Sequence, residues 1–368
     1  MIYTEPSQAL YLQIYDKQDN LKRCESVKSV LISGDPDKIP APYLSFVIPT
    51  YRREKLLEET LRSILVQPEA VPFEIVVVDN SADFSPENNT RRLIERLACP
   101  KLLYYINKAN LGQAGNWNRC IELARGGFVS MIHDDDLIAP DYLPLMLDCL
   151  RTASSLPVPL GAIKASFLKF CDPGRLPERH NRQRGGIRRF YKQTALRVTG
   201  IGPTSQPSCG TIFNREAVLR LGGFNPDYTP SHDYMLGYKL LVNGLAVYST
   251  EDMMGYYRIG ENAFRNKEDF VCFCKCDYYF REALYAENLL TSFFGSIFRN
   301  TQYSFSIDYF CKTARDVGIP IEKEAFFFQP GYGPHRILRF LFKVQRKLFT
   351  LRTNCVVLNH KNNRKSKK

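Results

Sequence analysis

The sequence predicts an α/β fold in which a mostly parallel sheet carries helices on both faces, followed by a helical C-terminal extension. Between residues 44 and 132, short apolar runs alternate with longer segments whose apolar residues recur at helical spacing. Several of the apolar runs end directly in carboxylates or other polar residues. This alternation is typical of parallel strands that are joined by helices lying on the faces of the sheet.

Four of the apolar runs are predicted to be buried strands, and three intervening segments are predicted to be helices. The strands span residues 44–48, 73–78, 102–106 and 128–132, and the helices lie around 56–65, 93–97 and 113–125. The pair Gly126–Gly127 stands where the third helix is expected to end. Ligands of such sheets bind outside the carboxyl ends of the strands. The residues that follow the strands are therefore the first candidates for a site.

The fourth strand ends in three consecutive carboxylates, Asp134, Asp135 and Asp136. Their like charges repel one another, and their hard oxygen atoms suit a cation such as Mg²⁺ or Mn²⁺. A solvated acidic turn is the alternative explanation. Tyr51 and Asp79 also follow predicted strands, so polar side chains from three strands are expected at one edge of the sheet. This coincidence favours a binding site over a solvated turn.

The second half of the chain is less regular. A strand, two helices and a closing strand are predicted at residues 210–213, 215–221, 231–243 and 245–248. Ser231 is a suitable N-cap for the longer helix and brings Asp233 into its first turn. Residues 175–192 carry seven Lys or Arg against one acid and are predicted to form a basic loop. Solvation and the binding of an anion explain this loop equally well.

Composition limits the class of protein. The chain of 368 residues suggests one large or two ordinary domains, and it shows neither a secretory signal nor a run of 18 apolar residues. Its eleven cysteines are scattered and odd in number, which favours reduced, cytosolic thiols. Cys272, Cys274 and Cys276 lie in a segment, residues 270–310, that is predicted to be helical. Their alternate spacing favours packed thiols over a zinc site.

Residues 335–368 form a basic tail with eleven Lys or Arg and no acid, whereas the remainder of the chain is close to neutral. Residues 335–352 carry apolar side chains along one helical face and basic side chains on the others. Such a helix can lie in an anionic membrane interface, and a packed helix with a solvated basic side is the alternative. The basic end that follows favours the membrane. We therefore expect a peripheral protein on the cytoplasmic face of a membrane.

Taken in order, the motifs between residues 44 and 260 resemble those of the inverting family 2 glycosyltransferases, which have the GT-A fold. The matching segments are Val47–Tyr51, Glu74–Ser81, Asn110–Gly112 with Asn116, His133–Asp136, Gly222–Phe224 and His232–Asp233. The resemblance implies a metal-dependent transfer of a sugar from a nucleotide-diphosphate sugar, UDP- or dTDP-linked. The acceptor would be a hydroxyl of a polysaccharide or of a lipid-linked saccharide.

The resemblance also implies which residues hold the nucleotide. Pro49, Thr50 and Tyr51 match the loop beneath the base, where an aromatic ring can stack. Asp79 matches the carboxylate that accepts a hydrogen bond from the base. Asn116 matches a residue of the segment that lines the nucleotide.

The remaining roles concern the metal and the chemistry. Asp134 and Asp135 match carboxylates that hold the donor, and Asp134 with Asp136 would bind Mn²⁺ or Mg²⁺. Because His133 stands where many relatives carry the first acid, a pairing of Asp134 with Asp135 at the metal stays open. Asp233 matches the general base that takes a proton from the acceptor hydroxyl.

Two further positions depart from the family pattern. His232 replaces the more usual Glu before the general base. Gly260 stands where a His often lies, in a segment that begins at Tyr256. A third, late metal ligand is therefore not assigned.

The sequence thus predicts four parts. They are an N-terminal extension (1–43), a GT-A glycosyltransferase domain (44–260), a helical extension packed on it (261–334) and a membrane-associating tail (335–368). A nucleotidyltransferase of related fold is one alternative, but it would need an early Gly-rich loop. A non-catalytic nucleotide-sugar binding protein is another, and retention of Asp233 argues against it. No nucleic-acid partner is expected, because no base-reading module accompanies the basic tail.

Overall fold

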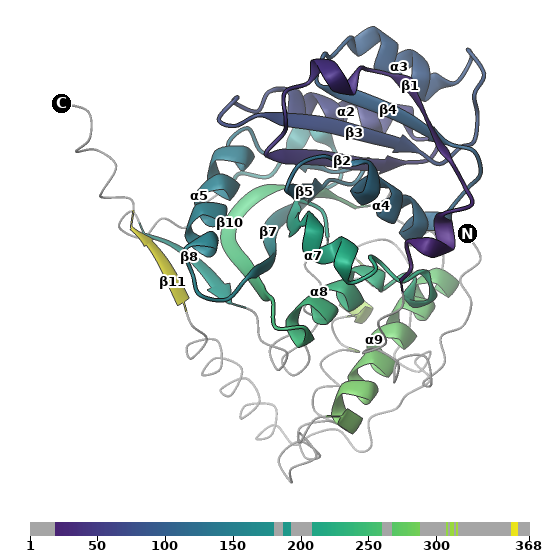
Figure 1. The fold of residues 1–368 in the computed structure, drawn as a ribbon. Helices are drawn as coiled ribbons and strands as arrows, with labels where there is room; N and C mark the ends of the chain where they lie inside the picture. The colour runs from purple at the N-terminus through teal and green to yellow at the C-terminus, as the bar shows by residue number, and fades with distance from the viewer. Residues whose placement is uncertain are drawn as a thin grey trace, which may run out of the picture.

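One mixed sheet runs through the part of the chain that the computed structural model describes (Figure 1). The described residues are 19–179, 187–192, 208–259, 267–287, 307, 310–312, 314, 315 and 355–359. The predicted amphipathic helix at 335–352 and the residues at 288–306 therefore lie outside the description.

The centre of the sheet consists of four parallel strands, β4 (Leu102–Asn107), β3 (Phe73–Asp79), β2 (Leu44–Thr50) and β5 (Phe128–Met131), in that order. Next to β5 lies β9 (Thr211–Asn214), which is antiparallel both to β5 and to the following strand. Because neighbouring parallel strands end at the same side, the carboxyl ends of β2, β3 and β5 form one edge.

The sheet continues on both sides of this centre. Beyond β9 it runs through β7 (Leu160–Phe170), β10 (Ala246–Arg258), β8 (Ile187–Lys192) and β11 (Cys355–Asn359), while β1 (Ser29–Ser33) lies at the other edge and β6 (Leu137–Ile138) pairs with β10. β7 and β10 are parallel to each other, and the remaining additions are antiparallel. Residues 187–192, predicted to be part of a basic loop, are thus a strand, because they pair with β10 and β11.

Helices cover both faces of the sheet. Their bounds are α2 (Glu54–Leu65), α3 (Asn89–Leu97), α4 (Gly112–Leu123), α5 (Tyr142–Ser154), α7 (Arg215–Arg220), α8 (His232–Val242) and α9 (Lys267–Glu287). The described residues also contain four short 3-10 helices: η1 (Lys22–Cys24), η2 (Pro36–Lys38), η3 (Pro173–Arg175) and η4 (Pro226–Tyr228). None of the helices in the described part combines the length and the apolar character that a membrane span needs.

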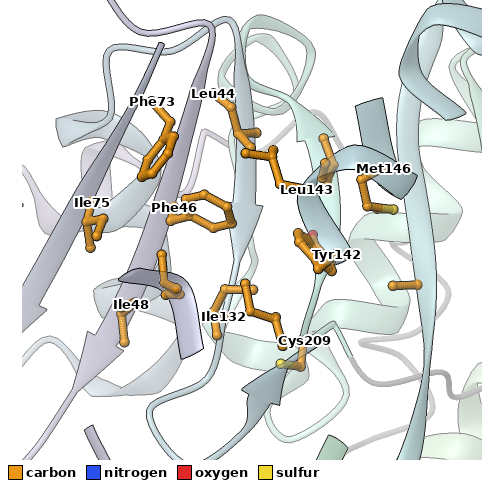
Figure 2. Packing of buried hydrophobic residues seen from close by; sticks show 14 of the residues in the cluster. Leu44, Phe46, Ile48, Phe73, Ile75, Ile132, Tyr142, Leu143, Met146 and Cys209 are labelled. Atoms are coloured by element: carbon orange, nitrogen blue, oxygen red, sulfur yellow. The ribbon is translucent and has the colours of Figure 1, made fainter. Parts of the chain in front are cut away.

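Alternation along the strands explains the two layers of helices. In β2, Phe46 and Ile48 point to the core shared with α2, α3 and α5, which Figure 2 shows from close by. Val47, between them, points to the opposite core, which α4, α7 and α8 cover. A strand that is buried on both faces reads as a continuous apolar run. The predicted α/β fold of GT-A type, with helices on both faces of the sheet, is confirmed.

The helical segment after residue 266 packs on this body through α8. Tyr234 and Tyr238 of α8 share a small core with Cys272 and Cys276 of α9. The predicted helix around residue 270 is therefore present, and its thiols are packed against aromatic rings. The ten cysteines for which the structure describes the side chain are in the thiol form and make no disulfide with one another.

The turn between α4 and β5 depends on a glycine for steric reasons. The amide of Gly126 donates to Ser45 Oγ at 2.9 Å, and a Cβ at this position would lie 2.8 Å from the backbone nitrogen of Ser45. A Cβ at the neighbouring Gly127 would meet no atom within 4 Å. The two glycines therefore form a matched pair, of which only one is crowded.

We expect Gly126→Ala to destabilise the protein by about 1–3 kcal/mol, the usual cost of forcing extra atoms into a packed site. Gly127→Ala should change the free energy of unfolding by less than about 1 kcal/mol. Urea denaturation of both variants, followed by circular dichroism, measures the difference. Equal stability of the two variants would contradict the steric explanation.

Candidate active site

The candidate site lies where β2, β3 and β5 end. Thr50 at the end of β2 is paired with Asp79 at the end of β3, and the amide of Asn80 donates to the Thr50 carbonyl oxygen at 2.9 Å. The acidic triplet follows β5, the other neighbour of β2. Tyr51 lies just beyond Thr50 and is 45% exposed, so its ring is open to a ligand. The structure thus brings the predicted residues of three strands to one edge.

Asp79 is fully buried, and both of its carboxylate oxygens are held. Oδ2 accepts from the Tyr104 hydroxyl at 2.8 Å and from Asn88 Nδ2 at 3.2 Å, while Oδ1 accepts from the amide of Ser81 at 2.8 Å. Burial, together with the nearby charge of Asp79, raises the pKa of the Tyr104 hydroxyl. Asp79 is therefore rigidly oriented, and carboxylate oxygens have lone pairs for a further donor.

Asn116 serves a network that fixes the beginning of α4. Its Oδ1 accepts from Asn107 Nδ2 at 2.9 Å, and its Nδ2 donates to the Val78 carbonyl oxygen at 3.1 Å. Asn107 Nδ2 also donates to Asn80 Oδ1 at 3.0 Å, and Asn80 Nδ2 in turn donates to Asn110 Oδ1 at 2.8 Å. The structure therefore gives Asn116 a positioning task, and its predicted contact with the nucleotide stays a prediction.

Arg53 brings the first two carboxylates of the triplet together. Its Nη1 donates to Asp134 Oδ1 and its Nη2 to Asp135 Oδ2, both at 2.9 Å. Asp134 Oδ2 accepts from the Thr50 hydroxyl at 2.8 Å. Burial raises the pKa of Asp134 to about 6, and the charge of Arg53 opposes this shift. The two carboxylates thus converge on one cationic group.

Asp136 points elsewhere. It is 0% exposed, its Oδ1 accepts from the amide of Arg258 at 2.8 Å, and its Oδ2 lies 3.5 Å from His133 Nδ1. Arg258 also donates through Nε to the Asp135 carbonyl oxygen at 2.8 Å and through Nη2 to Glu59. Burial raises the pKa of Asp136, and the neighbouring Asp135 adds to that effect. The predicted pairing of Asp134 with Asp136 at one metal stays a prediction, whereas Asp134 and Asp135 share one partner.

Asp233 lies in the first turn of α8, as predicted, beside two histidines. Its charge acts on both His133 and His232, although burial is the larger effect and lowers the pKa of each imidazole. Trp117 of α4 lies against both rings, with centroid distances of 5.0 Å to His133 and 4.5 Å to His232. Ser231 is the N-cap residue by position, but its side chain makes no capping bond.

A half-buried lysine, Lys164, approaches the same helix from β7. A Cβ at Gly237, one turn after Asp233, would lie 3.4 Å from Lys164 Nζ. Burial lowers the pKa of Lys164, and the charge of Asp233 opposes this shift. Lys164 is therefore the cationic neighbour of the candidate base.

Sequence reasoning missed the residues that surround the acids. Arg53 and Arg258 hold the acidic loop, Cys209 is hydrogen-bonded to Asp136, Trp117 contacts both imidazoles, and Lys164 is the cationic neighbour of Asp233. Arg53 follows the first quoted motif by two residues, and Arg258 lies in the late segment that begins at Tyr256. Their proximity to the motifs was the available signal. Nothing local could show which of the neighbouring basic side chains turns inward.

Known proteins share this domain. Residues 45–222 match the family model Glycosyl transferase family 2. The Succinoglycan biosynthesis protein ExoM of Rhizobium meliloti is 31% identical over 122 residues, which cover 32% of this chain and 38% of that protein. The GalNAc(5)-diNAcBac-PP-undecaprenol beta-1,3-glucosyltransferase of Campylobacter jejuni is 34% identical over 110 residues, which cover 29% and 34%. The chain thus spans about a third of the length of these relatives.

Among solved structures, the mannosyltransferase PcManGT from Pyrobaculum calidifontis, in complex with GDP-Man and Mn²⁺, aligns with 94% of this chain and 94% of its own. The TM-score is 0.48 and the sequence identity is 18%. Residues 45–222 form a glycosyltransferase family 2 domain.

His232 gives this site a measurable dependence on pH. Its imidazole is buried against Trp117 and Phe224, and burial lowers its pKa to about 4. Between pH 4 and the unfolded value near 6.5, the unfolded chain binds a proton at His232 that the folded chain does not. Stability therefore rises with pH in this window and is lost as the pH falls through it.

We expect His232→Phe to remove the contribution of His232 to the pH dependence of the free energy of unfolding. Between pH 4 and 6.5 this contribution amounts to about 3 kcal/mol. Urea denaturation at a series of pH values from 4.5 to 7.5 measures it. Phe224→Leu, at the non-titrating neighbour, is the control and should lower stability without changing the slope. If His232→Phe has the slope of the wild type, His232 does not remain neutral in the fold.

Proposed function

We propose that the protein is an inverting glycosyltransferase that moves a sugar from a nucleotide-diphosphate sugar to a hydroxyl of a polysaccharide or lipid-linked saccharide. One observation carries the proposal. Carboxylates from three separate elements gather around the carboxyl ends of β2, β3 and β5: Asp79, the pair Asp134 and Asp135, and Asp233. A sugar nucleotide needs a group for the base, a cation for the phosphates and a general base for the acceptor.

The nucleotide would bind over the loop that follows β2. The exposed ring of Tyr51 is available for stacking on the base. Pro49 and Thr50 are the last two residues of β2 and lie directly before Tyr51. Asp79, held by three donors, offers a fixed acceptor for a base N–H. These features support a uracil or thymine base, for which the donor would be UDP- or dTDP-linked.

The site fits a divalent cation at Asp134 and Asp135. Their carboxylates already converge on a positive charge, the guanidinium of Arg53, and offer the hard oxygen atoms that Mn²⁺ or Mg²⁺ prefers. When bound, such a cation neutralises the charge of the leaving nucleotide diphosphate. Arg53 would then turn from the carboxylates toward the phosphates. Asp136 anchors the same loop to β10 through the amide of Arg258.

Asp233 is the proposed general base. A helix N-terminus favours an ionised carboxylate, and Asp233 lies in the first turn of α8. It would take the proton of the acceptor hydroxyl while the hydroxyl oxygen attacks the anomeric carbon. The bond from that carbon to the nucleotide diphosphate breaks on the opposite side, so the configuration is inverted. His232, buried and neutral above pH 4, does not compete for the proton.

The names of the relatives support the acceptor class. One is a succinoglycan biosynthesis protein, and another is a glucosyltransferase whose name contains an undecaprenol-linked saccharide. A thermal-shift panel of nucleotide sugars, with and without Mn²⁺, tests the donor side. A ligand at about 100 times its dissociation constant adds about 2.7 kcal/mol of stability. No shift with any UDP- or dTDP-sugar in the presence of Mn²⁺ would count against the proposal.

We expect Asp233→Asn to lower turnover by about 100-fold or more, the usual contribution of a positioned acid–base group. Donor affinity and melting temperature should stay close to those of the wild type, because the change is nearly isosteric. Glu216→Gln, an exposed first-turn acid of α7, is the matched control and should retain activity. Transfer rate and donor affinity are measured on the same preparations. Normal turnover in Asp233→Asn would remove this residue from the mechanism.

We further propose that the basic tail holds the protein on the anionic cytoplasmic face of a membrane. Eleven positive charges without an acid support it, since each contributes about 1 kcal/mol near such a surface. Deleting the tail is not a clean test, because β11 lies within it and pairs with β8. The charges must therefore be removed while the strand is kept.

We expect binding to anionic vesicles to fall sharply when the basic residues beyond β11 are replaced by Gln. These residues are Lys361, Arg364, Lys365, Lys367 and Lys368. The control removes five exposed charges from the body, at Lys22, Lys38, Arg62, Arg151 and Arg220. Vesicle sedimentation at low and high salt measures both variants. Equal binding by the two variants would show that the tail does not direct the protein to the surface.

A further inference from the structure

Three side chains of different chemistry meet behind the acidic triplet. They are the imidazole of His133, the carboxylate of Asp136 and the thiol of Cys209, which precedes β9. One ligand atom of each lies within 4.8 Å of the other two, and His133 Nδ1 is 3.5 Å from Asp136 Oδ2. Asp136 and Cys209 are fully buried, whereas the His133 side chain is 20% exposed. An ion could reach the cluster along the imidazole.

The opposite atoms of these groups are held by other parts of the protein. His133 Nε2 is hydrogen-bonded to Ser208 Oγ at 2.9 Å, and Asp136 Oδ1 accepts from the amide of Arg258. Outer contacts of this kind orient the ligands of protein metal sites. Asp136 Oδ2 is buried and lies 3.5 Å from His133 Nδ1, and the thiol of Cys209 is hydrogen-bonded to the Asp136 side chain. The three remaining atoms, Nδ1, Oδ2 and Sγ, therefore face one another.

The composition of the cluster favours a particular class of ion. Imidazole and thiolate ligands suit Zn²⁺, whereas Mg²⁺ and Mn²⁺ prefer oxygen. An ionised carboxylate that is buried without a cation is costly, and the guanidinium of Arg258 is engaged with Glu59 and with the Asp135 carbonyl oxygen. A cation at the cluster would compensate the charge of Asp136.

We propose that His133, Asp136 and Cys209 form a binding site for one zinc-class cation. The ion is bound by Nδ1, Oδ2 and Sγ, and a water molecule completes a four-coordinate shell. On binding, the thiol proton of Cys209 leaves to solvent. The site differs from the pair at Arg53, which offers only carboxylate oxygens, and it does not depend on the proposed transferase activity.

The bound ion would connect the loop that follows β5 with the turn that precedes β9, its antiparallel neighbour. One carries the acidic triplet, and the other is the turn at Ser208–Gly210 that leads into β9. The two loops are joined by the hydrogen bond between His133 Nε2 and Ser208 Oγ and by the bond that the Gly210 amide donates to the Met131 carbonyl oxygen at 2.7 Å. Zinc would therefore make the acidic loop more rigid.

Cobalt(II) tests the site, because a cobalt–thiolate bond gives a charge-transfer absorption in the near ultraviolet that oxygen-only sites lack. One equivalent of Co²⁺, added to the full-length reduced protein without donor, should produce this absorption. The band should be lost in Cys209→Ser and retained in Cys120→Ser, which changes another fully buried thiol, on α4. Zn²⁺ should abolish the band by displacement, and excess Mn²⁺ should leave it unchanged.

His133→Gln supplies a second variant in case Cys209→Ser does not fold, as judged by circular dichroism and melting temperature. It should weaken Co²⁺ binding by at least about 10–100-fold, the loss seen when even an outer contact of a metal site is removed. Absence of the thiolate band in the folded wild type overturns the proposal. A band that neither variant diminishes overturns it as well, because the thiol is then a different cysteine. Since no donor or acceptor is present, failure of the transferase proposal would leave these results unaffected.

Discussion

The structure around the site depends on compensating three consecutive carboxylates that the fold withdraws from water. Asp134, Asp135 and Asp136 are 5%, 6% and 0% exposed, so their charges cannot rely on solvent. Arg53 compensates the first two charges, and Arg258, from a distant part of the chain, fixes the loop that carries them. Arg53 comes from the loop after β2 and binds the first two carboxylates, while Arg258 comes from the end of β10 and binds the loop backbone and the third. The acidic loop therefore holds its shape only when both halves of the chain are assembled around it.

This constraint explains the length of β10. The sequence predicts a closing strand at residues 245–248, whereas β10 continues to Arg258 through two irregular steps in its pairing with β7. Its far end pairs with β6, the two-residue strand that directly follows the acidic loop. A shorter strand would not bring Arg258 to the acidic loop, and Asp136 would lose the hydrogen bond from the Arg258 amide. Close packing of Gly255 against Phe167 and the Leu137 carbonyl oxygen permits this approach, since a Cβ there would lie 2.5 Å or less from them.

The parts of the fold that the sequence predicted are those that local patterns determine. The strands from β2 to β5 are continuous apolar runs because both of their faces are buried, and their predicted bounds agree with the structure within about two residues. The sequence did not predict β7, and it predicted only the beginning of β10. Polar residues, such as Lys164 in β7 and Asp252 in β10, interrupt the apolar pattern of both strands. The edge positions of Asp79, the acidic triplet and Asp233 followed from strand and helix ends. The direction of Arg53 and the meeting of His133 with Cys209 did not, since both depend on tertiary pairing between segments remote in sequence.

The site separates into two compartments that differ in how charge is balanced. Around the acidic loop, the guanidinium of Arg53 balances the charges of Asp134 and Asp135. Around α8, the ring of His232 meets Trp117 edge to face and the ring of His133 lies tilted against it, while Lys164 is the cationic neighbour of Asp233. The ammonium of Lys164 lies beside Gly237, one turn after Asp233, where a Cβ would be in ordinary contact with Nζ at 3.4 Å. The positive charge of Lys164 attracts the carboxylate of Asp233. The helix that carries Asp233 can therefore tolerate a first-turn carboxylate close to three others.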